Sequence, residues 1–224
     1  MGIAETPPVF RLVASLLIKL YRFRVVGSFP DLPGYVIVFG NHSSHWDMFW
    51  TLCVTRYAQF GKRVSWLYAE KLEHGWTRFL VAPWLRYFGG LPVDRTVAGQ
   101  NRVDYIVQEI ATGTHPVFGI APEGKRRWTP HWKSGFYFIA QAADVPLVLL
   151  TVDYNQRVIH VGPRVDLTGD VSRDMDQLRA HFGRFTPKFP EKVGPVCIRE
   201  EDSPVPAQSV LRSQHKRRCA VLSG

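Results

Sequence analysis

Cysteine is scarce in this chain, and the few that occur form no recognisable pattern. Cys53, Cys197 and Cys219 are odd in number, widely separated and without a CxxC spacing. A small disulfide-stabilised fold and a cysteine-based zinc site are therefore not indicated. Free cysteines in such an arrangement are typical of a reducing compartment, so we expect a protein of the cytoplasmic side.

A long apolar run is also missing. The apolar segment 9–20 is interrupted by Arg11 and Lys19, whereas a membrane-spanning helix needs about 20 apolar residues. Glu5 and two prolines precede this segment, in place of the basic start of a secretory signal, so we expect neither a signal peptide nor a membrane span. Helical spacing of the apolar residues instead predicts an amphipathic helix over residues 8–23. That helix either lies on a membrane surface or packs its apolar face on the protein core.

Acidic residues are the minority charge. The chain has 28 lysines and arginines against 19 acidic residues, a net charge of +9 and a pI near 9.7, which favours an anionic partner. Nucleic acid is disfavoured, because no recognised binding motif accompanies the charge and the aromatic residues alternate with aliphatic ones. Seven tryptophans and 14 phenylalanines suit a membrane interface. We therefore expect a peripheral or monotopic protein at the cytoplasmic face of a membrane.

Internal repeats are absent, and 224 residues are enough for one domain. Strand-like and helix-like segments alternate, which predicts a single α/β domain with a mixed or mostly parallel sheet flanked by helices. We expect an N-terminal amphipathic helix with a short strand leading into the domain (1–30), the main domain (31–199), and a flexible basic tail (200–224). Strands are predicted at 35–39, 64–69, 91–93, 116–121, 145–152 and 157–165, and helices at 46–57, before 87, and at 99–111, 134–143 and 171–182.

The densest group of reactive side chains follows the predicted strand 35–39, in the segment Asn41-His42-Ser43-Ser44-His45-Trp46-Asp47. Strand-to-helix turns of α/β domains carry functional loops. If the turn folds His42 back over the first helical turn, Asp47 can hold one ring nitrogen and leave the other as a base. Three alternatives stay open. The first is that Asp47 only caps the helix, the second that His42 or His45 is a buried structural residue, and the third that His42, His45 and Asp47 bind a metal. The metal site is the least favoured, because the other histidines are scattered along the chain.

Two further clusters end predicted strands. The first, Gly89-Gly90-Leu91-Pro92-Val93-Asp94-Arg95, contains an arginine that can bind phosphate, although a solvated strand end has the same composition. The second, Ala121-Pro122-Glu123-Gly124-Lys125-Arg126-Arg127, is either a solvated basic turn or a loop that binds a phosphorylated head group. The ends of strands at one edge of a sheet converge on a crevice, so the three clusters are informative together.

In order and content, these clusters resemble the glycerolipid acyltransferases of the lysophosphatidate acyltransferase group. The blocks of that family read NHxxxxD, GxxFIDR, FPEGTRS and a later proline-containing apolar strand. Here the corresponding segments are 41–47, 90–95, 121–127 and 145–148, and Trp132-Lys133-Ser134-Gly135-Phe136 resembles the stretch between the last two. The second block departs from the pattern in Leu91-Pro92-Val93, and the third in Ala121 and Lys125-Arg126-Arg127, which bears on the identity of the acceptor.

The resemblance implies transfer of a fatty acyl group from acyl-CoA or acyl carrier protein to the hydroxyl of a lysophospholipid such as lysophosphatidate. It implies no metal and no cofactor other than the co-substrate, and an anionic membrane surface as a partner. Alternatives are a non-catalytic basic module that binds anionic lipid and a transacylase that takes its acyl group from a phospholipid. The implied catalytic residues are His42 and Asp47, and the implied substrate-binding residues are Asn41, Arg95, Glu123, Gly124, Lys125 and Arg126.

Overall fold

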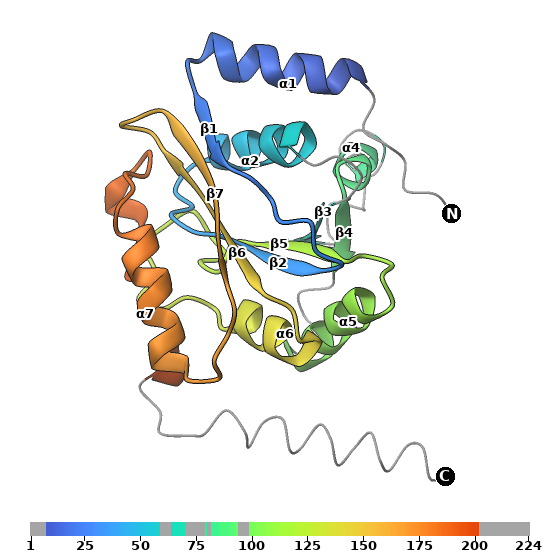
Figure 1. Cartoon of the computed structure of the whole chain (residues 1–224), viewed down its shortest axis with the longest axis vertical. Coiled ribbons are helices and arrows are strands. Elements are labelled where there is room, and N and C mark those ends of the chain that lie inside the picture. Colours follow the sequence, from blue (N-terminus) through green and yellow to red (C-terminus); the bar gives the residue numbers. More distant parts are fainter. Residues whose placement is uncertain (1–7, 59–63, 70–78, 80–81, 94–98, 202–224) are drawn as a thin grey trace.

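The computed structural model of the chain describes residues 8–58, 64–69, 79, 82–93 and 99–201. Within these residues, a sheet of seven strands lies between two layers of helices (Figure 1). The strands are β1 (Arg24–Gly27), β2 (Tyr35–Phe39), β3 (Val64–Ala69), β4 (Gly90–Val93), β5 (Val117–Ile120), β6 (Leu147–Asp153) and β7 (Val158–Val165). The helices are α1 (Pro8–Leu20), α2 (His45–Ala58), α4 (Ala82–Tyr87), α5 (Gly99–Ala111), α6 (Gly135–Ala143) and α7 (Val171–Phe182), with short 3-10 helices η2 (Pro190–Lys192) and η3 (Arg199–Glu201).

The strand order is β1-β7-β6-β2-β5-β3-β4, and β6, β2, β5, β3 and β4 all run parallel. β7 is antiparallel to β6, and β1 is parallel to β7. Only residues 154–157 separate β6 from β7, and a parallel neighbour would need a crossover of a dozen or more residues. The predicted α/β class, with a mostly parallel sheet flanked by helices, is confirmed.

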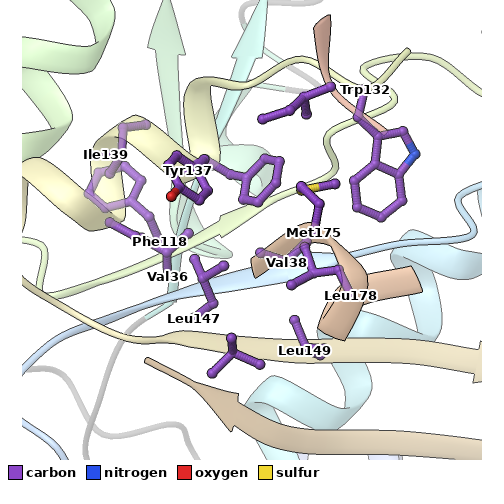
Figure 2. Packing of buried hydrophobic residues seen from close by; sticks show 14 of the residues in the cluster. Val36, Val38, Phe118, Trp132, Tyr137, Ile139, Leu147, Leu149, Met175 and Leu178 are labelled. Carbon is purple, nitrogen blue, oxygen red and sulfur yellow. The ribbon is translucent and has the colours of Figure 1, made fainter. Parts of the chain in front are cut away.

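Both faces of the sheet are buried. All five residues of β2 are buried: Val36 and Val38 face α5, α6 and α7, whereas Tyr35, Ile37 and Phe39 face α1 and α2. Strands covered on both faces read as continuous apolar runs, as YVIVF does here. Figure 2 shows the first of these cores, where side chains of α6 and α7 pack over β2 and β6.

Helix α1 confirms the predicted N-terminal helix and has two apolar stripes. Ala14 and Ile18 are buried against the core that includes α2. Leu12, Leu16 and Leu20 form the other stripe and are 69%, 62% and 70% exposed. Core packing therefore uses only part of the apolar surface of α1. No helix among the described residues is long and apolar enough to cross a membrane. From residue 202 onward, the predicted tail lies outside the described residues.

The parallel strands place the sequence clusters at one edge of the sheet. β5 and β6 are the two neighbours of β2 and run parallel to it. The segments that follow these three strands, 40–47, 121–127 and 154–157, therefore leave the sheet at the same edge. This is the position at which open α/β sheets form their binding crevices.

Candidate active site

The chain turns sharply where β2 ends, and the turn is anchored on α7. Asn41 has a φ of 63°, in the left-handed region that asparagine tolerates better than most residues. The Asn41 side chain donates a hydrogen bond from Nδ2 to the carbonyl of Phe182, at 3.1 Å. A Cβ atom at Gly40 would lie only 2.7 Å from the Phe182 ring, so the close approach of this ring requires glycine. The structure thus gives the predicted ligand-binding residue Asn41 a hydrogen bond within the protein.

Asp47 caps the helix that follows. Ser44 is the residue before α2, and its Oγ accepts from the Trp46 N–H at 3.2 Å. Asp47 Oδ2 reaches back to accept from the N–H groups of Ser43 and Ser44, at 2.8 and 2.7 Å. These reciprocal bonds are similar to a capping box, except that Ser44 Oγ accepts from the second residue of the helix rather than from the third. The helix-cap alternative from the sequence therefore describes Asp47 correctly, although it does not describe all that this carboxylate contacts.

The same carboxylate faces His42. Nδ1 of His42 lies 3.2 Å from Oδ2 of Asp47, and the two side chains are only 6% and 1% exposed. The alignment at Nδ1 falls short of a full hydrogen bond, as is common in catalytic pairs before substrate tightens them. Nε2 is on the side of the ring that faces away from the carboxylate. The predicted pair is thus brought together in an arrangement that would orient Nε2 as a base.

Tyr154 contacts the other oxygen of Asp47. Its hydroxyl donates to Oδ1 at 2.6 Å. Burial raises the pKa of Tyr154 well above its usual range, and the neighbouring Asp47 carboxylate adds to the shift. Tyr154 belongs to none of the three clusters of the sequence. Its position directly after the apolar strand β6 was a usable signal, because the ends of neighbouring parallel strands converge.

Glu123 supports His42 from the opposite neighbouring strand. Its Oε1 accepts from the backbone N–H of His42 at 3.1 Å, and its Oε2 is buried without a hydrogen bond in the described part of the chain. Burial raises the pKa of Glu123 from 4.5, and hydrogen bonds from the backbone of Glu123, His42 and Asn41 together with the charge of His42 oppose the shift. The sequence cluster 121–127 therefore meets the cluster 41–47 through Glu123.

The loop after Glu123 collects positive charge. Gly124 has a φ of 65°, and a Cβ atom there would lie 2.9 Å from the Lys133 Nζ, so the Lys133 side chain lies across this glycine. The backbone N–H of Lys133 donates to the carbonyl of Pro122 at 2.9 Å. Lys125 and Arg126 are exposed on the same loop. The loop therefore presents several cations to an anionic group.

Other predicted residues differ in their placement. Arg95 of the sequence cluster 89–95 lies outside the described residues, and β4 ends at Val93. His45 is exposed at the first position of α2. Among the residues that the structure describes, histidine, cysteine and acidic side chains do not gather in groups of three that could hold a metal ion.

An apolar cavity lies next to His42. The Phe39 ring is 5.5 Å from the His42 ring, centre to centre, and Phe39 is part of the cavity wall. The cavity has a volume of about 50 Å³. The wall is made by α2, β2, β3, β5 and the residue after α4, through Ile37, Phe39, Met48, Thr51, Leu52, Thr55, Val64, Trp66, Phe88, Gly119, Ile120 and Ala121.

The chain matches known proteins in its sequence profile and in its fold. The sequence profile of the acyltransferase family matches residues 22–152, a segment that contains His42, Asp47 and Glu123 and ends just before Tyr154. No sequence among curated proteins matches the chain. The crystal structure of the 1-acyl-sn-glycerophosphate acyltransferase PlsC from Thermotoga maritima has a similar fold. The TM-score is 0.52 at 15% identity, over 79% of this chain and 75% of that chain.

Proposed function

Because this chain belongs to the acyltransferase family, we propose that it transfers a fatty acyl group from acyl-CoA or acyl carrier protein to the hydroxyl of a lysophospholipid such as lysophosphatidate. The buried pair of His42 and Asp47 at the end of β2 is the observation that carries the proposal. The similar fold of an enzyme named for 1-acyl-sn-glycerophosphate supports this acceptor class. The reaction needs no cofactor other than the acyl carrier itself.

In the proposed reaction, His42 Nε2 accepts the proton of the acceptor hydroxyl as its oxygen attacks the thioester carbonyl. The carbon–sulfur bond then breaks, the thiolate leaves, and the imidazolium returns its proton to the departing sulfur. Asp47 stabilises the imidazolium while it exists. No acyl-enzyme is formed. Cys53 is a poor candidate for a covalent nucleophile, because burial raises the pKa of its thiol to about 11 and disfavours the nucleophilic thiolate.

The surroundings of the pair suit the two ends of a lysolipid. The exposed cations Lys125 and Arg126, with Lys133 across Gly124, favour the phosphate of the acceptor. By family resemblance, Arg95 contributes to the same contact. The apolar cavity beside His42 would receive the first carbons of an acyl chain, and a longer chain would extend beyond its roughly 50 Å³.

We infer further that α1 brings this site to an anionic membrane surface. The exposed stripe of Leu12, Leu16 and Leu20 is followed by Tyr21, whose ring lies 6.2 Å from that of Trp46, the neighbour of Asp47. Lys188 Nζ lies 5.3 Å from the centre of the Trp46 ring. Exposed leucines, aromatic rings and a cation thus lie in succession from α1 to the catalytic turn, residues 40–47. This arrangement fits a peripheral protein that takes its substrate from the membrane.

The first experiment follows free thiol released from acyl-CoA, and then from acyl carrier protein, with lysophosphatidate as acceptor. Acceptor-dependent release by the wild type is expected to be lost in His42→Ala and kept in His45→Ala, which changes an exposed histidine of the same turn. A panel of lysolipids then ranks the acceptors. A folded protein that binds anionic liposomes but releases no thiol with any lysolipid would contradict the proposal and favour a binding module. Acyl transfer from a phospholipid in the absence of thioester would identify a transacylase.

Membrane binding is tested separately by sedimentation with anionic and zwitterionic vesicles. Leu16→Ser is expected to weaken binding to anionic vesicles by about tenfold, because an exposed leucine contributes on the order of 1–2 kcal/mol when buried in the acyl region. Tyr105→Ser, which changes an exposed aromatic residue of α5 on the other face of the sheet, is the matched control. Equal binding by both variants would remove α1 from the membrane contact.

A further inference from the structure

Asp47 is held by donors from two different parts of the fold. Its Oδ2 accepts from the backbone N–H groups of Ser43 and Ser44, which belong to the same turn as Asp47 itself. Its Oδ1 accepts from the hydroxyl of Tyr154, which follows β6 on the neighbouring strand. At 2.6 Å, this is the length of a charge-assisted bond between a hydroxyl and a carboxylate. Tyr154 therefore ties the carboxylate to the sheet, whereas the amides tie it only to its own loop.

Tyr154 is itself fixed on several sides. Its backbone N–H donates to the carbonyl of Thr186 at 2.9 Å. Its ring makes an edge contact with Phe23 at 5.9 Å between centres, and Lys188 Nζ lies 5.8 Å from the ring centre. The segment that follows α7 also reaches the catalytic turn, because the N–H of Phe189 donates to Ser43 Oγ at 3.2 Å. A hydroxyl supported in this way can hold the carboxylate against rotation about its Cβ–Cγ bond.

We propose that Tyr154 is a positioning residue that acts on His42 through Asp47. By fixing the plane of the carboxylate, its hydroxyl keeps Oδ2 directed at Nδ1 and so keeps the proton of the neutral imidazole on Nδ1, with Nε2 free to accept. The consequence for catalysis rests on the proposed acyl transfer, but the consequence for the histidine does not. Tyr154 lies beyond residues 22–152, which match the family profile, so the role is read from the geometry of this chain alone.

A purely structural role must be distinguished, because the large majority of buried carboxylate oxygens accept a hydrogen bond whether or not they serve catalysis. The chain offers a chemically matched control. Tyr137 donates through its hydroxyl to Oδ2 of Asp174 at 2.9 Å, and Asp174 is fully buried and also accepts from the N–H groups of Thr168 and Gly169. Tyr137 belongs to the core of α6 and α7 that Figure 2 shows, and this core lies on the other face of the sheet from the core that includes α2. Tyr137→Phe removes the same chemical group from the same kind of partner.

The experiment compares wild type, Tyr154→Phe and Tyr137→Phe in two assays. In steady-state kinetics, Tyr154→Phe is expected to lower kcat by about 10- to 100-fold and to leave KM within about twofold. This is the range typical of losing a hydrogen-bond partner that orients a functional side chain from behind. The acid limb of its pH–rate profile should also move relative to wild type. Tyr137→Phe should leave kcat and the profile as they are, while lowering the melting temperature. Installing 4-aminophenylalanine at position 154, which restores an N–H donor, should recover part of kcat.

The second assay does not depend on turnover. Nitrogen-15 NMR of histidine-labelled protein reports which ring nitrogen carries the proton, and the His42 signals are those that disappear in His42→Gln. Wild type and Tyr137→Phe should show His42 with its proton on Nδ1, and Tyr154→Phe should show a mixture of both tautomers. If the phenylalanine variant does not fold, the 4-aminophenylalanine protein replaces it in the comparison: its N–H is a weaker donor than the tyrosine hydroxyl, so the fraction of His42 with its proton on Nδ1 should fall below that of wild type.

The proposal is overturned if Tyr154→Phe changes neither the His42 tautomer nor the pH–rate profile more than Tyr137→Phe does. It is also overturned if both variants lose stability equally and keep kcat. Absence of acyl transfer by the wild type would contradict the proposed function. In that case the NMR comparison still decides whether Tyr154 positions the pair.

Discussion

Replacing Asp47 by asparagine should remove the charge beside His42 while keeping most of the turn. The asparagine oxygen can take the place of Oδ2 and still accept from the N–H groups of Ser43 and Ser44. Its NH₂ group then faces the Tyr154 hydroxyl, whose oxygen can accept as well as donate. The substitution therefore tests electrostatic stabilisation of the imidazolium with little disturbance of the helix cap.

The expected loss follows from the distance in the pair. For unit charges separated by the 3.2 Å between Nδ1 and Oδ2, the attraction is about 5 kcal/mol at an effective dielectric constant of roughly 20. Solvent screening is small, because the side chains are only 6% and 1% exposed. The neutral hydrogen bond that asparagine retains returns about 1 kcal/mol. A net loss of about 4 kcal/mol corresponds to a decrease in kcat of about 10³-fold.

The assay is thiol release by wild type, Asp47→Asn, His42→Ala and the double variant, which together form a double-mutant cycle. If Asp47 acts through His42, the asparagine substitution should cost almost nothing further once His42 is alanine. Melting temperatures of the four proteins show whether the turn has remained folded.

Two results would refute this reasoning. A decrease in kcat of less than about tenfold in Asp47→Asn would show that the carboxylate charge does not stabilise a developing imidazolium. An equal decrease in the presence and absence of His42 would show that Asp47 acts independently of the histidine, for example only as the cap of α2.

Three further predictions concern other positions. Glu123→Gln should raise the free energy of urea unfolding more at pH 7 than at pH 4. The folded protein raises the pKa of Glu123 from 4.5, so the stability that the protonated carboxyl group contributes is lost as pH rises through the folded-state pKa. An equal effect at both pH values would contradict the burial of an ionising carboxyl group. Cys53→Ala should keep kcat within about twofold, whereas a burst of acyl-enzyme that disappears in this variant would show covalent catalysis. Gly119→Leu should shift preference to shorter acyl thioesters by about tenfold, because a Cβ atom there has no neighbour closer than 3.5 Å and the added side chain enters the cavity; an unchanged profile in a series of acyl-CoA lengths would place the acyl chain elsewhere.

Much of the fold could be predicted from local patterns. The apolar run Tyr35–Phe39 forms β2 with the predicted bounds, because a strand covered on both faces needs apolar residues throughout. The predicted strands 145–152 and 157–165 left four residues between them, too few for a crossover, so even the antiparallel pairing of β6 and β7 was implicit in the spacing. The pairing of β1 with β7 had no comparable signal, since β1 is a short strand of mostly exposed residues.

The sequence by itself determined the near neighbours of the site: the strand, the turn and the helix that bring His42 and Asp47 together are contiguous, and only four residues lie between the pair. The tertiary structure alone decided the distant partners. Tyr154 reaches Asp47 across 107 residues, Glu123 reaches the backbone of His42 across 81, and Asn41 reaches the carbonyl of Phe182 across 141. The first two contacts depend on β6 and β5 lying on either side of β2, and the third depends on the packing of α7. Hydrophobic periodicity specifies which face of a strand is buried but not which strands become neighbours, because that choice is made by the packing of the whole sheet.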